Sequence, residues 1–217
     1  MIERHIHAVA IEDPGHEEPA RTRERLRDIF PAGSTRRMTQ LGLVLGSVLH
    51  PIAPREEDAV VYASAYAETG ALEAYLASFP TASPMLFQTS IHPSAVQQVL
   101  IARERSVRQF YPLTGRLQLV AHAVQTALLA PAARSILCGG EERRLRLLEH
   151  DTGSPETFAF ALALSADPSG ALGTLGLDAS DAPEGSICLP DFFSALRDRR
   201  PLREAAAPGL TVILSWT

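Results

Sequence analysis

The order of apolar and turn-forming segments between Ser83 and Glu142 constrains the fold most strongly. Apolar residues recur at helical spacing from His92 to Arg103, and a short strand-like run follows from Val107 to Tyr111. A sharp turn then leads into a second helical pattern from Gly115 to Ala130. A further apolar run from Ser135 to Cys138 stops at a Gly-Gly pair. Strands that alternate with helices in this way predict an α/β fold.

The remaining segments continue this alternation. Further strands are predicted at Ile6 to Ile11, Ala59 to Ser64, Phe158 to Leu164, Ala171 to Leu177 and Leu210 to Trp216. Further helices are predicted at Glu17 to Phe30, from Ser34 or Thr35 to Leu49, at Thr69 to Phe79 and at Asp191 to Arg199. We therefore expect a mostly parallel, mixed five-stranded sheet with helices on both faces and antiparallel strands added late in the chain.

Three local signals refine this outline. A turn of sequence Asp-Pro-Ser-Gly separates the strands Phe158 to Leu164 and Ala171 to Leu177, so we expect them to pair as a hairpin. The glycine pair Gly139-Gly140 is expected to end its strand. Gly42 and Gly46 lie four residues apart in a predicted helix, which allows another element to approach closely.

Composition narrows the class of protein. The chain has 217 residues, of which 46% are hydrophobic, so one domain with a real core is expected. Its 20 basic residues are all arginine, and the formal charge of −5 does not favour nucleic-acid binding. No apolar run reaches the ~20 residues of a membrane helix. The N-terminus shows no signal-peptide core, and two cysteines make no disulfide framework, so we expect a cytoplasmic location.

A local motif points to a family. Ser83-Pro84-Met85-Leu86-Phe87, followed by Ser90-Ile91-His92, resembles the SP-x-x-F…S-[VI]-H segment of short proteins related to the β-ketoacyl synthase N-terminal domain. Such proteins are often described as chain-length-factor-like and belong to aryl-polyene and type II fatty-acid-like pathways. The resemblance covers about Arg36 to Leu164, and the chain departs from the pattern at Pro93 and Gln97.

The resemblance implies half of a thiolase-like fold. It makes residues 1–217 a single ketosynthase N-terminal-like domain, with a core at about 36–164 and a C-terminal extension at 165–217. In the related enzymes a cysteine lies at the strand-to-helix turn and holds the acyl chain as a thioester. Counted back from the glycine pair, that position falls near Thr114 or Gly115. No counterpart of the enzymes' two C-terminal histidines is found in this chain.

Thr114 cannot replace a cysteine by itself. A cysteine at a helix N-terminus is activated because the helix dipole favours its thiolate, whereas a threonine hydroxyl needs an adjacent base. No histidine or carboxylate lies within the turn, so we expect Thr114 to cap the following helix. Cys138 lies in an apolar strand and is expected to act as a small hydrophobic residue, and Cys188 is a weaker candidate.

Histidine and glutamine residues complete the candidate site. His92 precedes a predicted helix beside the expected active-site region. Together with Gln97, Gln118 and His122 it forms our candidate set for a subunit interface or acyl tunnel. His5 and His7 share one face of a strand, but no third ligand is identifiable, so no metal or cofactor is expected.

The main functional prediction is a non-catalytic ketosynthase-like subunit, or chain-length-factor-like partner. Its partner would be a full-length ketosynthase or a second copy of the chain, with an acyl carrier protein as a further candidate. The arginine-rich segments Arg21 to Arg27, Glu142 to Arg146 and Arg197 to Arg203 would suit that acidic protein. The first alternative is a small acyl-transfer or thioester-hydrolysing enzyme that uses Thr114, Ser90 or Cys138 with His92. The second is a scaffold that touches no acyl group.

Overall fold

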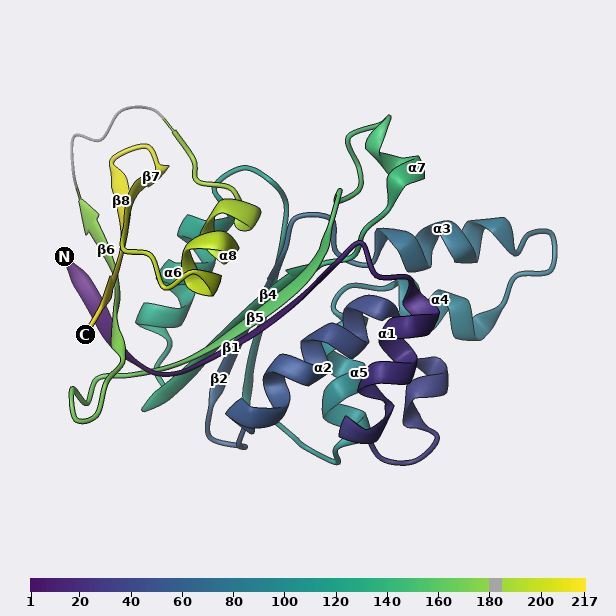
Figure 1. Cartoon of the computed structure of the whole chain (residues 1–217), viewed down its shortest axis with the longest axis horizontal. Helices are drawn as coiled ribbons and strands as arrows, with labels where there is room; N and C mark the ends of the chain where they lie inside the picture. Colours follow the sequence, from purple (N-terminus) through teal and green to yellow (C-terminus); the bar gives the residue numbers. More distant parts are fainter. Residues whose placement is uncertain (180–184) are drawn as a thin grey trace.

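A single curved sheet with helices on both faces organises the chain (Figure 1). The computed structural model describes residues 1–179 and 185–217. The strands are β1 (Ile2–Gly15), β2 (Ala59–Ser64), β3 (Gln109–Thr114), β4 (Arg134–Glu141), β5 (Thr157–Ser165), β6 (Gly173–Ala179), β7 (Leu202–Ala207) and β8 (Leu210–Trp216). The helices are α1 (Pro19–Leu26), α2 (Gln40–Ile52), α3 (Thr69–Ala77), α4 (Pro84–Ser90), α5 (Ser94–Ala102), α6 (Leu119–Leu129), α7 (Leu145–Leu148) and α8 (Leu189–Arg197), with 3-10 turns at Arg27–Ile29 and Ser34–Arg37.

The α/β class is confirmed, whereas the expected strand number is wrong. The described residues form an eight-stranded sheet in the order β3-β2-β4-β5-β1-β6-β8-β7. The pairs β2–β3 and β2–β4 are parallel, and the five other pairs are antiparallel. The sheet is therefore mixed, and it is not mostly parallel. The late antiparallel strands β6 and β8 are present as expected.

The N-terminal strand lies in the middle of the sheet. β1 pairs with β5 on one side and with β6 on the other, so Ile6 is opposite both Leu164 and Gly173. The expected direct pairing of β5 with β6 is therefore wrong, because β1 separates them. A turn signal between two strands predicts only that the chain reverses there, and it cannot report a third strand inserted from elsewhere in the sequence.

Two hydrophobic layers cover the two faces of the sheet. α6 and α8 pack on one face, and α1, α2 and α5 pack on the other (Figure 1). Successive side chains of β5 point alternately into the two hydrophobic layers. Phe158 and Phe160 face α6 and α8, whereas Ala159 and Ala161 face α2. Because alanine side chains are small, α2 can lie close against the sheet. Most residues of α2 are accordingly buried.

α2 also approaches its other neighbours closely, as its two glycines predicted. A Cβ atom on Gly46 would lie 2.3 Å from the Phe30 ring, and one on Gly42 would lie 3.0 Å from Gln98 Oε1. The start of this helix differs from the prediction. Residues Ser34–Arg37 form a separate 3-10 turn, and Thr39 caps α2 because its hydroxyl accepts a hydrogen bond from the Gly42 N–H at 3.0 Å.

The glycine pair lies inside β4 and does not end it. β4 continues to Glu141, with β2 and β5 on its two sides. A Cβ atom on Gly139 would lie 2.7 Å from the carbonyl oxygen of Ala63 and 2.7 Å from the Phe160 ring. The glycines are therefore needed for tight packing of three strands, which explains why the expected strand end is wrong.

Among the described residues, no helix is both long and apolar enough to cross a membrane.

Candidate functional site

The C-terminal ends of the parallel strands form the candidate site. β2 ends at Ser64, β3 at Thr114 and β4 at Glu141, and Ser64 lies opposite Thr114 in the sheet. Parallel strands all present their carboxyl ends at one edge, where loops can hold polar side chains together. Two buried carboxylates lie near this edge, Glu141 at the end of β4 and Glu68 in the loop after β2.

Glu141 is the most perturbed acid of the site. Its side chain is buried, and it accepts hydrogen bonds from the Ser64 hydroxyl at 3.1 Å and from the backbone N–H groups of Ala65 and Tyr66. Burial raises the pKa of Glu141 to about 8, although these hydrogen bonds oppose the shift. The carboxyl group thus fixes the loop after β2 and is largely protonated at neutral pH.

His92 is held by a second buried acid. Its Nδ1 lies 2.9 Å from Glu68 Oε2, and the other carboxylate oxygen of Glu68 accepts a hydrogen bond from the Ala95 N–H at 3.0 Å. Glu68 therefore joins His92 to the first turn of α5. The sequence analysis missed Glu68, because an acid just before a predicted helix carries no specific signal.

Tyr62 lies under His92. The two ring centroids are 5.0 Å apart, and Tyr62 is completely buried. Burial, and secondarily the charges of Glu68 and Glu141, raise the pKa of Tyr62 well above its ordinary value. Neither the Tyr62 hydroxyl nor His92 Nε2 has a hydrogen-bond partner among the described residues. Tyr62 and His92 therefore interact through their rings. No hydrogen bond joins His92 Nε2 to a serine, threonine or cysteine side chain among the described residues.

The strand-to-helix turn differs from the prediction. α6 begins at Leu119, and its N-cap is Gln118 with a left-handed backbone (φ 59°). The expectation that Thr114 caps this helix is wrong, because Thr114 is the last residue of β3 and is exposed. The Gln118 N–H donates a hydrogen bond to the Ser186 hydroxyl at 3.0 Å. Gln118 is therefore the residue of this turn that adopts the left-handed backbone conformation, which is uncommon for residues other than glycine.

The remaining candidates do not converge on one point. Gln97 is exposed on α5, and His122 is exposed on α6 one turn after Gln118. α5 and α6 belong to the layers on opposite faces of the sheet.

The other candidate nucleophile and the candidate metal ligands have local partners. The Ser90 hydroxyl donates to the carbonyl oxygen of Phe87 at 2.8 Å. His7 Nε2 contacts Asp167 O and Ser165 Oγ, each at 2.9 Å. No group of three potential metal ligands occurs among the described residues.

The thiols lack the environment of a catalytic cysteine. Cys138 is fully buried between β2 and β5, and burial raises its pKa to about 12. Cys188 is exposed before α8, and its sulfur lies 2.9 Å from Asp191 Oδ2. Burial, and secondarily this hydrogen bond to Asp191, raise the pKa of Cys188. Since the thiolate is the nucleophile, neither sulfur is activated.

A thiol-labelling experiment checks this assignment. We expect iodoacetamide to modify one cysteine per native chain, and we expect Cys188→Ala to abolish that modification. Cys138 should react only after unfolding, because a buried thiol with a raised pKa is both inaccessible and protonated. Peptide mass spectrometry locates the label. Rapid labelling of Cys138 in the native protein would contradict the assignment.

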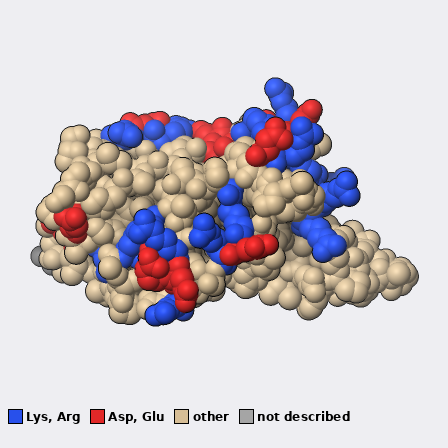
Figure 2. Space-filling view, turned by 90° about the horizontal axis from the view of Figure 1, so that it is seen from below, with Lys and Arg blue, Asp and Glu red and all other residues tan. Residues whose placement is uncertain are grey.

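An apolar hairpin projects beside this site (Figure 1). We call residues 69–91, which contain α3 and α4, the apolar hairpin. Its sole charged residue is Glu73. Its large apolar side chains that are exposed are Leu72, Leu76, Phe79, Met85, Phe87 and Ile91. The Tyr75 ring holds the two helices together, with its centroid 5.4 Å from those of Phe79 and Phe87. Seen from below, this end of the molecule is largely free of charged atoms (Figure 2).

Solved structures similar to this chain are found, although no similar sequences are. No protein family model matches the sequence, and a comparison with curated proteins finds no match. A solved structure of a ketosynthase (ApeO) in complex with its chain length factor (ApeC) from Xenorhabdus doucetiae does match. The match covers 99% of this chain and 100% of that chain, with a TM-score of 0.69 and 17% sequence identity. The fold is that of the ketosynthases and their chain length factors.

Two further structures support the ketosynthase fold. The ishigamide ketosynthase/chain length factor matches over 82% of this chain and 68% of its own chain, with a TM-score of 0.62 and 11% identity. A β-ketoacyl synthase from Burkholderia phymatum STM815 matches over 86% and 66%, with a TM-score of 0.52 and 14% identity. The thiolase-like architecture expected from the Ser83 to His92 motif is thus confirmed. Sequence identities this low support a shared fold, but they do not establish a shared activity.

Proposed function

We propose that this chain is a non-catalytic ketosynthase-like subunit that works as the chain-length-factor-like partner of a ketosynthase. Its pathway would be type II fatty-acid-like or aryl-polyene biosynthesis, in which an acyl carrier protein delivers the growing chain. One observation supports the proposal: the ketosynthase fold is present, but the strand-to-helix turn from Thr114 to Gln118 contains no cysteine, and neither cysteine of the described residues is activated. Thioester chemistry needs an activated nucleophile.

The match to a ketosynthase–chain length factor complex supports the same proposal. The matched chain is spanned completely by this one, so the likeness extends from end to end and is not confined to a shared core. The function of such a partner would be structural. It would help to shape the acyl tunnel of the catalytic subunit, and the candidate residues His92, Gln97, Gln118 and His122 would lie near the joint surface.

Two exposed features suit that joint surface. Within the described part of the chain, β3 lies at an end of the sheet order and pairs with β2 alone, so one edge of its backbone is free for another strand. The apolar hairpin precedes α5 and β3 in the chain and exposes six large apolar side chains. An apolar patch bordered by polar surface is typical of a protein–protein interface. A second copy of the chain is the alternative occupant of this surface.

A two-part experiment tests the function. The protein is incubated with an acyl thioester, and we expect no covalent mass gain by intact-mass spectrometry. It is then co-expressed with the ketosynthase of the same gene neighbourhood, and we expect the two chains to co-purify in equal amounts. A stable acyl adduct that is lost in Thr114→Ala, Ser90→Ala or Cys138→Ala would contradict the proposal. So would separate elution of the two chains on size exclusion.

A further inference from the structure

The apolar hairpin is attached to the rest of the chain mainly at its base (Figure 1). Of residues 69–91, only Gly70 and Ala71, at the start of α3, are buried. α3 packs chiefly on α4, and the hydroxyl groups of Thr89 and Ser90 donate to carbonyl oxygens within the hairpin. A segment that buries so little against the body can change its position without unfolding of the core.

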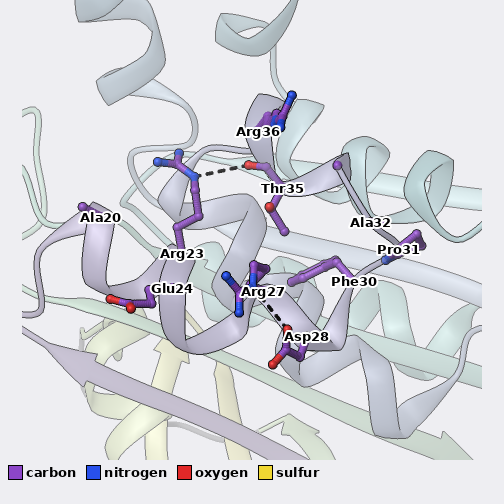
Figure 3. A pocket seen from close by; sticks show the side chains of 11 residues that line it. Ala20, Arg23, Glu24, Arg27, Asp28, Phe30, Pro31, Ala32, Thr35 and Arg36 are labelled. Atoms are coloured by element: carbon purple, nitrogen blue, oxygen red, sulfur yellow. Dashed lines mark hydrogen bonds and ion pairs between the residues drawn. The ribbon is translucent and has the colours of Figure 1, made fainter.

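The segment around α1 shows the opposite arrangement. Arg23 donates from its Nε to the Thr35 carbonyl oxygen at 3.3 Å and from a terminal nitrogen to the Met38 carbonyl oxygen at 3.2 Å. Figure 3 shows the first of these bonds. Arg25, half a turn further along, pairs with Glu12 at 2.6 Å. α1 is thus fixed along its length, whereas the hairpin depends on the contacts at its two ends.

One pair of side chains closes the base of the hairpin. Glu68 is the residue before the hairpin, and His92 is the residue after it. Glu68 Oε2 lies 2.9 Å from His92 Nδ1, and we call this contact the clasp. The two side chains are 1% and 18% exposed, so water competes little for the hydrogen bond between them. The clasp therefore joins the two ends of a 23-residue segment that has few other attachments.

Both members of the clasp are fixed to the body of the protein. The other carboxylate oxygen of Glu68 accepts a hydrogen bond from the Ala95 N–H at 3.0 Å, which ties Glu68 to the first turn of α5. The His92 ring lies 5.0 Å from the ring of Tyr62, a completely buried residue of β2. The clasp thus connects the hairpin to an element of each kind, a helix and a central strand.

The surroundings of the clasp are rigid as well. Glu141 accepts hydrogen bonds from the Ser64 hydroxyl and from the backbone N–H groups of the next two residues, so the loop that leads to the hairpin is held to β4. The Arg144 guanidinium, which pairs with Glu142, covers Gly70 so closely that a Cβ atom there would collide with it. The hairpin therefore leaves the body from a fixed base.

We propose that the clasp fixes the position of the apolar hairpin relative to the sheet. When the clasp opens, α3 and α4 move together, because the Tyr75 ring contacts that join them lie inside the hairpin. Glu68 and His92 are then positioning residues, and neither has to touch a partner. A hairpin fixed in advance loses less conformational entropy on binding. That a ketosynthase is the molecule bound rests on the proposed function, whereas the clasp itself does not.

The distance between two spin labels reports the position of the hairpin. One nitroxide is attached to α3 through Leu76→Cys and one to α6 through Leu129→Cys, since both positions are exposed. The Cys188→Ala background removes the exposed native thiol. With the clasp intact, we expect pulsed electron paramagnetic resonance to give one narrow distance distribution.

Two substitutions of His92 separate the hydrogen bond from the ring contact. His92→Phe keeps a ring against Tyr62 but lacks the nitrogen that meets Glu68, so the distribution should become about twofold broader or more. His92→Asn lacks the ring, but its side-chain amide offers an N–H donor near the place of Nδ1, so the distribution should stay narrow. Equal broadening in both variants, or a narrow distribution in His92→Phe, would overturn the inference.

A matched control removes a histidine contact elsewhere. His7→Phe loses two 2.9 Å contacts of Nε2 at the end of β5, and it should leave the hairpin distribution narrow. A second label pair, at Ile101→Cys and Leu129→Cys, lies outside the hairpin and should be unaffected by His92→Phe. Broadening of this second pair would show that His92→Phe loosens the whole protein, and the inference would then be wrong.

Binding to the ketosynthase is measured separately by surface plasmon resonance. Glu68→Ala is suitable, because a side chain that is 1% exposed acts on a partner only through the hairpin. The distance distribution should broaden, and the affinity should fall about 10-fold, because fewer molecules present the hairpin correctly. A broad distribution with unchanged affinity would support the clasp and count against the hairpin as the ketosynthase surface. A narrow distribution in Glu68→Ala would overturn the clasp at any affinity.

Discussion

Introducing glutamate at Leu76 and Met85 should strongly weaken association with the ketosynthase while leaving the chain folded. These side chains are 58% and 52% exposed, so the free protein loses little packing. In the complex they would be buried, and an unpaired carboxylate in an apolar contact is strongly unfavourable. We expect Leu76→Glu combined with Met85→Glu to weaken the complex by at least about 100-fold, measured by surface plasmon resonance.

The control for this prediction uses a more exposed apolar residue on another element. Ile101 lies on α5 and is 76% exposed. Ile101→Glu should leave the affinity within a factor of about three, as expected for a residue outside the interface. If the hairpin variant binds the ketosynthase normally, the apolar hairpin is not the interface. If both variants lose binding, the effect is not specific to the hairpin.

The stability of the protein should fall as the pH rises from about 5 to about 9, and Glu141→Gln should remove most of that fall. The folded state raises the pKa of Glu141 from the ordinary 4.5 to about 8. The folded protein therefore binds the proton more tightly than the unfolded chain does. The resulting stabilisation is complete below the unfolded pKa and is lost as the pH passes the folded pKa.

The size of the effect follows from the shift. Each pKa unit corresponds to about 1.4 kcal/mol, so this carboxyl contributes a fall of about 4 kcal/mol across that range. Urea unfolding at a series of pH values measures it. Glu149→Gln, which changes an exposed carboxyl, is the control and should keep the slope of the original protein. An unchanged slope in Glu141→Gln would show that Glu141 does not cause the pH dependence.

The elements with regular apolar patterns were predictable from the sequence. β2 matches its predicted range, Ala59 to Ser64, because all six of its residues are buried and apolar or small. β7 was missed because Arg203 and Glu204 in its centre are exposed, as suits an edge strand. α4 was also missed, since its short sequence buries no residue and shows no helical period.

The position of the turn before α6 could be predicted closely, whereas the contacts around it could not. The motif around His92 led to the correct fold, and the turn before α6 was placed within four residues. The special backbone conformation of Gln118 could not be read from sequence, because glutamine rarely adopts a positive φ and the nearby Gly115 gave the stronger signal. The contact of His92 with Glu68 spans 24 residues and depends on how two loops pack.

The central place of β1 has a consequence for how the protein is made. β1 is synthesised well before both of its neighbours in the sheet, β5 and β6, which lie in the last third of the given sequence. The nascent strand therefore lacks its partners in this sheet until β5 and β6 have been synthesised. The sheet therefore closes late in folding, through contacts between residues that are far apart in the sequence.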